Sequence, residues 1–212
     1  MARNLLFGGL LLSLLSVGCS PSHQPAEEAN QLDKSAVVME NMLSRRSIRK
    51  YKPQAVNRDT MHTILNCGIQ APNGMNKQSW AIRVVDNPEI IDGLTELYVQ
   101  QNPKAKSKPG FVNIFNGSHT VAFIAHDTTY DLSQVDCGLL GENMMLSAWS
   151  MGIGSCCLGG PVRFMNSEPA AEYLKRLDFP EGYELLYAIA FGYPDEAPAA
   201  KPRSTEKFRY VD

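Results

Sequence analysis

The sequence lacks the residue patterns of a metal site. Its four histidines are scattered through unlike contexts, and its five cysteines include no CxxC pair. Leaving Cys19 aside, we interpret Cys67, Cys137, Cys156 and Cys157 as small apolar residues of the interior. A redox pair of Cys156 and Cys157 is the alternative, although adjacent cysteines bridge only with strained geometry. We therefore expect no bound metal.

An excess of positive charge is also missing, as is the fingerprint of a dinucleotide-binding sheet. The formal net charge is −2, and a nucleic-acid-binding protein usually has a strong basic excess. Neither a GxGxxG motif nor a repeated strand–helix–strand pattern is present. These absences argue against nucleic acid as a partner and against a doubly wound parallel sheet.

No apolar run reaches the length of about 20 residues that a membrane-spanning helix needs. The Leu-rich run near the start follows one cation, Arg3, and has the form of a secretory signal peptide over residues 1–18. Ser16-Val17-Gly18-Cys19 resembles a bacterial lipobox, with Cys19 as the lipid acceptor. An ordinary signal peptide that happens to contain a cysteine is the alternative. We expect a protein of the bacterial cell envelope, outside the cytoplasm and lipid-anchored through Cys19.

The residues after Cys19 divide into a tether and one domain. Residues 19–33 hold the lipidated cysteine and a polar, proline-containing segment that we expect to be flexible. Residues 34–212 are long enough for a single domain with a substantial core. Apolar periodicity predicts helices at 35–44, 59–70, 88–101, 134–151 and 169–177, and strands at 80–85, 120–125 and 184–191, with extended chain at 152–158. The segment 102–118 is predicted to be a loop.

A cluster of cations lies just past the first predicted helix. Arg45, Arg46 and Arg49 offer planar forks of N–H donors, and Ser47 adds a small hydroxyl, a combination that suits a phosphomonoester. If the helix runs on to Arg45, Arg45 and Arg49 lie about one turn apart and point the same way. The alternative is a helix end whose cations face the negative end of the dipole.

Four segments taken together resemble a known family. Residues 45–49 (RRSIR), 71–80 (APNGMNKQSW), 152–160 and 201–203 (KPR) are similar, in that order, to the motifs of the FMN-dependent nitroreductase family. The resemblance implies an α+β fold whose central mixed or antiparallel sheet is flanked by helices. It also implies an intertwined homodimer that holds two FMN molecules at the subunit interface.

The resemblance also implies which residues contact the cofactor. The phosphate and ring edge would be met by Arg45, Arg46, Ser47, Arg49, Lys201 and Arg203. The opposite subunit would supply Pro72, Asn73, Gly74 and Asn76, and the flavin N5 would lie near Cys157, Leu158, Gly159 and Gly160. This chain departs from the usual family pattern at three positions: Asn73 in place of Ser, Ser79 in place of Pro, and Gly159 where several members have an acid.

By the same resemblance, the protein is an FMN-dependent oxidoreductase that reduces nitroaromatics, quinones or similar electron-poor molecules in a ping-pong reaction. Flavin N5 transfers the two electrons, so no catalytic side chain is required. The donor would be NAD(P)H or, outside the cytoplasm where those nucleotides are scarce, another reductant. The alternatives are a non-catalytic FMN-binding lipoprotein or a relative with different flavin chemistry, such as dehalogenation, azoline oxidation or flavin cleavage.

Overall fold

The computed structural model describes residues 25–211, with side chains from residue 33 onward. The predicted leader, Cys19 and the first residues of the tether lie outside this range. The chain divides into two compact units that meet between residues 38 and 39, and each unit is described by itself. No helix within residues 25–211 is both long enough and apolar enough to cross a membrane.

Helix α1, Pro25–Ser44, contains the whole described part of the first unit. It begins at Pro25 rather than near residue 35, where the apolar periodicity predicted its start. The reason is local: proline is well tolerated at the first helical position, and the Glu, Gln, Leu and Ala residues that follow have high helix propensity.

The second unit is built on a four-stranded sheet. Its strands are β1 (Trp80–Val85), β2 (Thr120–Asp127), β3 (Gly154–Leu158) and β4 (Tyr183–Gly192). They lie in the order β1-β2-β4-β3, and every neighbouring pair is antiparallel. The α+β class, the flanking helices and the strand at 80–85 are therefore confirmed.

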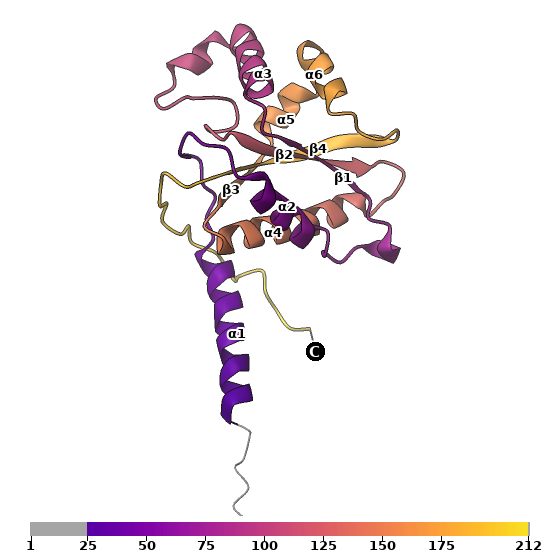
Figure 1. Cartoon of the computed structure of the whole chain (residues 1–212). Coiled ribbons are helices and arrows are strands. Elements are labelled where there is room, and N and C mark those ends of the chain that lie inside the picture. Colours follow the sequence, from indigo (N-terminus) through magenta and orange to yellow (C-terminus); the bar gives the residue numbers. More distant parts are fainter. Residues whose placement is uncertain (1–24, 212) are drawn as a thin grey trace, which may run out of the picture. The chain divides into compact units, whose positions relative to one another are not determined.

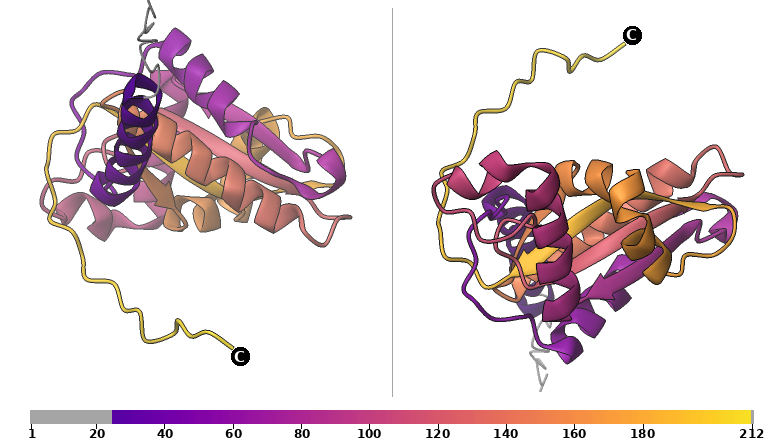
Figure 2. Two further views of the ribbon diagram at one scale, coloured as in Figure 1. Left: turned by 90° about the horizontal axis from the view of Figure 1, so that it is seen from below. Right: turned by 90° about the horizontal axis from the view of Figure 1, so that it is seen from above.

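Helices cover both faces of the sheet (Figure 1). One face packs against α2 (Arg58–Gly68) and α4 (Ser133–Ser150), and the other against α3 (Pro88–Gln101), α5 (Gly160–Met165) and α6 (Ala171–Arg176). Figure 2 shows the two helix layers in turn, from below and from above. The second unit is thus a three-layer arrangement with one core on each side of the sheet.

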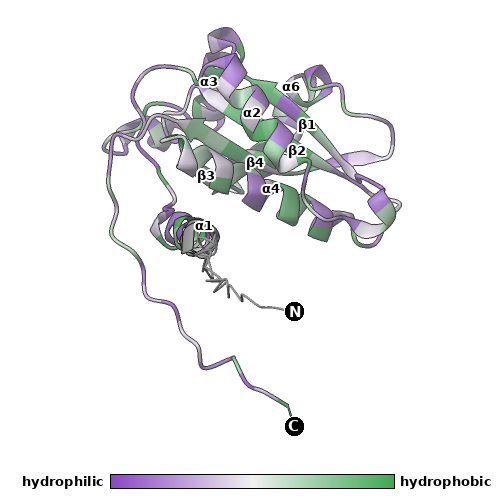
Figure 3. Ribbon diagram, turned by 60° about the horizontal axis from the view of Figure 1, so that its bottom comes forward, coloured by the Kyte–Doolittle hydropathy of each residue, from purple (hydrophilic) through white to green (hydrophobic). Residues whose placement is uncertain are grey.

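Strand β2 shows how the sequence supplies both cores. Val121 and Phe123 point into the core under α3 and α5, whereas Ala122 and Ile124 point into the core under α2 and α4. All four are fully buried, because successive side chains of a strand alternate between the two faces. The continuous apolar run therefore marks a central strand covered on both sides, and the central strands are hydrophobic in Figure 3.

No helix was predicted between residues 158 and 169, but α5 begins at Gly160, because proline in the first turn of a helix loses no hydrogen bond. The segment 102–118 contains a short 3-10 helix, η2 (Pro103–Ser107), and the buried Asn113 side chain bonds the N–H groups of Phe115 and Gly117.

Candidate functional site

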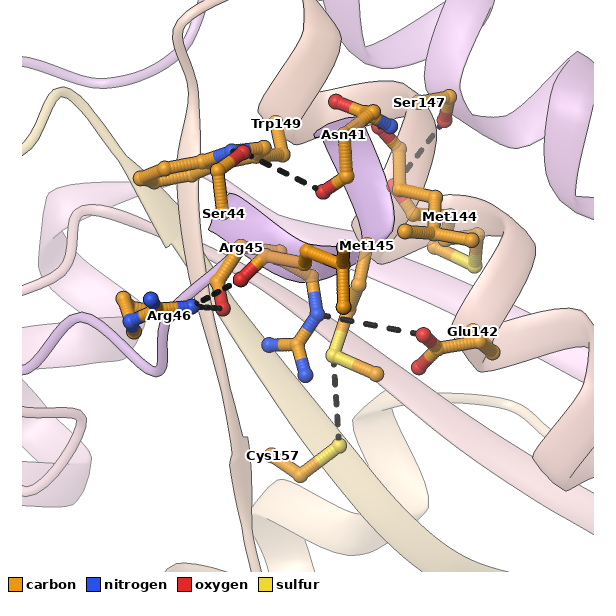
Figure 4. Close-up of polar contacts among 12 residues, drawn as sticks. Asn41, Ser44, Arg45, Arg46, Glu142, Met144, Met145, Ser147, Trp149 and Cys157 are labelled. Carbon is orange, nitrogen blue, oxygen red and sulfur yellow. Dashed lines mark hydrogen bonds and ion pairs between the residues drawn. The ribbon is translucent and has the colours of Figure 1, made fainter. Parts of the chain in front are cut away.

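The end of α1 is fastened to α4, and this places the cationic cluster. The amide of Asn41 donates to the carbonyl of Leu146 at 3.0 Å, and the indole N–H of Trp149 donates to the Ser44 hydroxyl at 2.9 Å. Figure 4 shows Asn41, Ser44 and Trp149 beside Arg45. Trp149 thus holds the helix end that precedes the cations.

Helix α1 ends at Ser44, so the premise that the helix runs on to Arg45 is wrong, although the Arg45 N–H still donates to the Asn41 carbonyl at 3.2 Å. Ser47 forms a parallel bridge with Ser155, and the N–H of Ile48 donates to the carbonyl of Ser155 at 3.0 Å. Ile48 is buried in the core. Because side chains alternate along an extended chain, Ser47 and Arg49 share one side of the segment, and Ile48 lies on the other.

Glycines allow this extended segment to approach the sheet closely. A Cβ on Gly154 would lie 2.8 Å from Cγ1 of Ile48, and a Cβ on Gly192 would lie 2.6 Å from Cδ1 of Tyr51. Real Cβ contacts are longer than this. Larger residues at the ends of β3 and β4 would push residues 48–51 outward, so these glycines help to place the cations.

The tail after β4 pairs with the same extended segment. Tyr51 forms an antiparallel bridge with Pro194, Lys52 donates its N–H to the Tyr193 carbonyl at 2.9 Å, and Asp195 donates to the Lys50 carbonyl at 3.0 Å. This pairing carries the chain beyond residue 196 alongside the cations. Two segments about 150 residues apart in the sequence are thereby brought together. The residue pattern of either segment alone does not predict this pairing.

The paired segments enclose one cavity of about 590 Å³, which we call the cationic cavity. Its lining contains every residue predicted for the phosphate: Arg45, Arg46, Ser47, Arg49, Lys201 and Arg203. The remaining lining residues are Met42, Leu43, Pro198, Ala199 and Ala200, which sequence reasoning missed because small and apolar residues leave no chemical signal.

The cations of this cavity are poorly compensated by the protein itself. Arg45 has its Nε atom buried without a hydrogen-bond partner among the described residues, and its nearest acid, Glu142, is 3.9 Å away. Arg46 differs, because its Nη1 donates to the carbonyls of Leu43 and Arg45 at 2.6 and 2.8 Å and so caps the end of α1. The helix-end interpretation therefore applies to Arg46, while Arg45 retains an unsatisfied donor suited to an anion.

A second hollow of about 670 Å³ lies between α6 and β4. It is larger, but its charged residues, Lys175, Asp178 and Glu184, are of mixed sign. It has neither the concentrated positive charge of the cationic cavity nor any of the predicted site residues.

Pro72, Asn73, Gly74 and Asn76 lie on a separate loop, which ends at the buried Ser79, and none of them lines the cationic cavity. The Asn73 side chain is engaged within this loop: its carbonyl oxygen accepts from the Gln78 N–H at 2.9 Å, and its amide donates to the Ala71 carbonyl at 3.3 Å. Met75, exposed at the tip, and Asn76 both have φ of +53°. The Asn73 side chain thus links the two ends of the loop.

The predicted contacts at the end of β3 are divided between surface and core. Gly159 and Gly160 are exposed, and a Cβ added to either meets no protein atom within 4 Å. Leu158 is buried in the core, so only its backbone can face a ligand. Cys157 keeps an exposed edge, but its sulfur lies 3.7 Å from the Met145 sulfur, and burial raises the pKa of its thiol to about 11.

Asp136 is a functional candidate that sequence reasoning missed. It is a buried carboxylate on α4 that contacts the 73–79 loop through Gly74 and Ser79. The available signal was an acid, one of two with Glu142, in a helix that is largely apolar. The four cysteines of the described range are free, and no cluster of metal-ligating side chains occurs among the described residues.

The chain is similar in sequence to known flavin reductases. The chain is 29% identical over 172 residues to an NADPH-flavin oxidoreductase of Vibrio harveyi, a match that covers 78% of this chain and 69% of the relative. It is 25% identical over 184 residues to an FMN reductase (NADPH) of Bacillus subtilis, covering 82% of this chain and 72% of the relative.

Solved structures have the same fold. A nitroreductase with bound FMN from Desulfitobacterium hafniense superposes with a TM-score of 0.72 at 27% identity, over 82% of this chain and 98% of that one. An FMN-dependent nitroreductase from Clostridium difficile gives a TM-score of 0.69 at 26% identity, over 82% and 98%. The model of the nitroreductase family matches residues 42–193, from the end of α1 to the residue after β4. The chain therefore belongs to the nitroreductase family.

Proposed function

We propose that this chain binds FMN and is an FMN-dependent oxidoreductase that transfers two electrons to small electron-poor molecules. The observation that carries the proposal is the cationic cavity, in which two distant segments converge and Arg45 keeps a buried, unpartnered Nε. A phosphate dianion supplies the acceptors that these donors lack, and charge-assisted bonds of this kind are stronger than neutral ones.

The residues present fit the phosphate of FMN by number and chemistry. Guanidinium forks come from Arg45 and Arg49, a hydroxyl from Ser47, and exposed cations from Lys201 and Arg203. Arg46 contributes charge while its Nη1 caps α1. The names of the relatives, an NADPH-flavin oxidoreductase and an FMN reductase, support the same cofactor and class of activity.

The ring system would lie across a subunit interface. In a homodimer, the 73–79 loop of one protomer would meet the flavin whose phosphate is held by the other, and residues 157–160 would border the ring. Large apolar residues are exposed at the end of α1 and on α4, including Leu43 at 76%, Val135 at 57% and Leu139 at 40%. Such residues are typical of a surface covered by a partner. Sedimentation of the purified protein at about twice the monomer mass is the expected result.

When bound, FMN supplies the redox chemistry, and the chain supplies position and electrostatics. The cations hold the cofactor and favour negative charge near it. The exposed Gly159-Gly160 pair leaves room for an aromatic acceptor without adding charge. We assign nitroaromatics and quinones as acceptors and NAD(P)H or another reductant as donor, without a catalytic side chain.

The location of the protein is a separate part of the proposal. The sequence of residues 1–19 supports a lipid anchor on Cys19 in the bacterial cell envelope, which would separate the domain from cytoplasmic nicotinamide nucleotides. Incorporation of a labelled fatty acid into the wild-type protein, and its loss in Cys19→Ser, is the expected result. A labelled Cys19→Ser protein would contradict the anchor.

The test of the function is an absorption spectrum of the purified protein incubated with FMN and freed of excess, followed by anaerobic titration with NADPH and NADH. A flavin spectrum that bleaches and is restored by a quinone or nitroaromatic is the expected outcome. A bound flavin that passes electrons to no acceptor would favour the non-catalytic carrier. Absence of bound flavin would overturn the proposal.

A further inference from the structure

The 73–79 loop has a conformation that its own residues do not favour. Met75, Asn76 and Gln78 have φ of +53°, +53° and +49°. Left-handed backbone is unfavourable for residues with a Cβ, and clusters of it occur where a surrounding structure imposes the shape, often at ligand sites. Something outside residues 75–78 must therefore hold this loop.

Asp136 makes the contacts that can do so. Its Oδ2 accepts from the Ser79 hydroxyl at 2.7 Å, and its Oδ1 accepts from the Gly74 N–H at 3.2 Å. One carboxylate thus bridges the two ends of the strained segment. Both Asp136 and Ser79 are almost fully buried, at 2% and 1% exposure, so these bonds do not compete with bulk water.

The position of Asp136 explains how a charge is tolerated there. It lies in the first turn of α4, where the positive end of the helix dipole stabilises an anion. A buried carboxylate is otherwise strongly unfavourable, and an apolar residue would suit the surrounding core. Two further hydrogen bonds contact the loop: the Asn73 side-chain oxygen accepts from the Gln78 N–H at 2.9 Å, and the Ser79 carbonyl accepts from the Asp127 N–H at 3.1 Å. Lys77 lies over the Tyr130 ring, 4.4 Å from its centroid, and is itself exposed.

We propose that Asp136 is a positioning residue that holds the 73–79 loop in its flavin-binding conformation by bridging Gly74 and Ser79. This inference rests on the proposed function, in which the loop contacts the flavin ring. Ser79, which stands where the family usually has proline, gives this chain a hydroxyl anchor in place of a rigid ring. The loop is then organised before the ligand arrives.

The experiment compares Asp136→Ala with Asn113→Ala. Asn113 is a matched control, because it is also buried, at 5% exposure, and its side chain bonds two backbone N–H groups in a different loop. Two quantities are measured: the rate of tryptic cleavage after the exposed Lys77 in the flavin-free protein, and the dissociation constants for FMN and riboflavin.

We expect Asp136→Ala to raise cleavage after Lys77 about tenfold, and to weaken FMN and riboflavin by the same factor of about ten, since two buried bonds to the loop are lost. Asn113→Ala should lower the melting temperature about as much as Asp136→Ala does, but it should leave both the cleavage rate and the flavin affinities within about twofold of wild type. Asp136→Asn should rescue the loop, because its amide can still accept from Gly74 and donate to the Ser79 oxygen.

Three results would overturn the inference. Equal cleavage after Lys77 in Asp136→Ala and Asn113→Ala would mean general destabilisation, and unchanged cleavage would mean that Asp136 does not hold the loop. Faster cleavage with unchanged flavin affinity would mean that the loop does not bind flavin.

If Asp136→Ala does not fold, Ser79→Ala removes one of the two bonds and gives the same comparison. Failure of the proposed function is distinguishable, because wild-type protein would then bind neither flavin while the cleavage comparison still reports on Asp136.

Discussion

The cationic cavity and the 73–79 loop are both irregular segments, yet they are stabilised in opposite ways. The polar groups of the loop are paired within the protein, by Asn73 of the loop itself and by the buried Asp136 of α4. The cavity leaves donors unpaired, as with the buried Nε of Arg45, and several of its cations are exposed. Under the proposed function, the protein preorganises the loop that meets the flavin ring and leaves the phosphate site to be completed by its ligand.

Removal of two cavity cations should have the largest effect. We expect Arg45→Ala/Arg49→Ala to weaken FMN by at least about 100-fold, because each charge-assisted bond to the phosphate contributes about 1.5–3 kcal/mol. Riboflavin, which has no phosphate, should bind as it does to wild type. Quenching of flavin fluorescence measures both affinities, and Lys104→Ala, an exposed cation outside the cavity, is the control. Equal losses for both ligands would contradict the division of labour between cavity and loop.

A change in the loop should give a smaller loss that does not depend on the phosphate. In Gly74→Ala the new Cβ would lie 1.9 Å from the Tyr130 hydroxyl oxygen, so the loop or the tyrosine must move. We expect FMN and riboflavin to be weakened by the same factor, about tenfold, as for the loss of a well-placed contact. In Gly138→Ala the Cβ meets no atom within 4 Å on α4, so that variant should gain up to about 1 kcal/mol of stability.

Ionic strength separates the two regions without any mutation. Raising the salt concentration from 0.05 to 0.5 M should weaken FMN several-fold, because the cavity cations are partly exposed and the screening length falls below about 5 Å. Riboflavin affinity should change by less than about twofold, since riboflavin carries no charged phosphate for the salt to screen. A titration of both ligands at the two salt concentrations checks this. An equal response would mean that the phosphate is not bound by these cations.

The smallest effect concerns Cys157, which borders the predicted ring site. Because burial raises the pKa of its thiol to about 11, the thiol is protonated at neutral pH and its alkylation should be slow. The thiolate fraction is lost as pH falls below 11, so at pH 8 it is about one part in a thousand. In a Cys67→Ser background the alkylation rate should rise about tenfold per pH unit up to pH 10, as measured by mass spectrometry. Rapid alkylation at pH 7 would show that the sulfur is less buried than its contacts indicate.

Much of the second unit could be predicted from local sequence. The strand at 80–85 and the helix at 88–101 were predicted with the bounds that they have, because turn residues precede each and the apolar pattern is unambiguous. Helix α5 was missed, since glycine and proline are common both in turns and at helix starts. The start of α1 was misplaced because polar composition alone does not distinguish a tether from a solvent-exposed helix.

The sequence by itself determined which chemistry is available: a cluster of guanidinium groups and a hydroxyl near residue 47, two cations near residue 202, and a short loop after α2. Tertiary structure decided how these groups meet. The pairing of residues 193–195 with 50–52 brings the two cationic segments to one cavity, and the first turn of α4 brings Asp136 to the loop. Both depend on contacts between residues far apart in the chain, where the free energy of burial and hydrogen bonding, rather than local propensity, determines the partner.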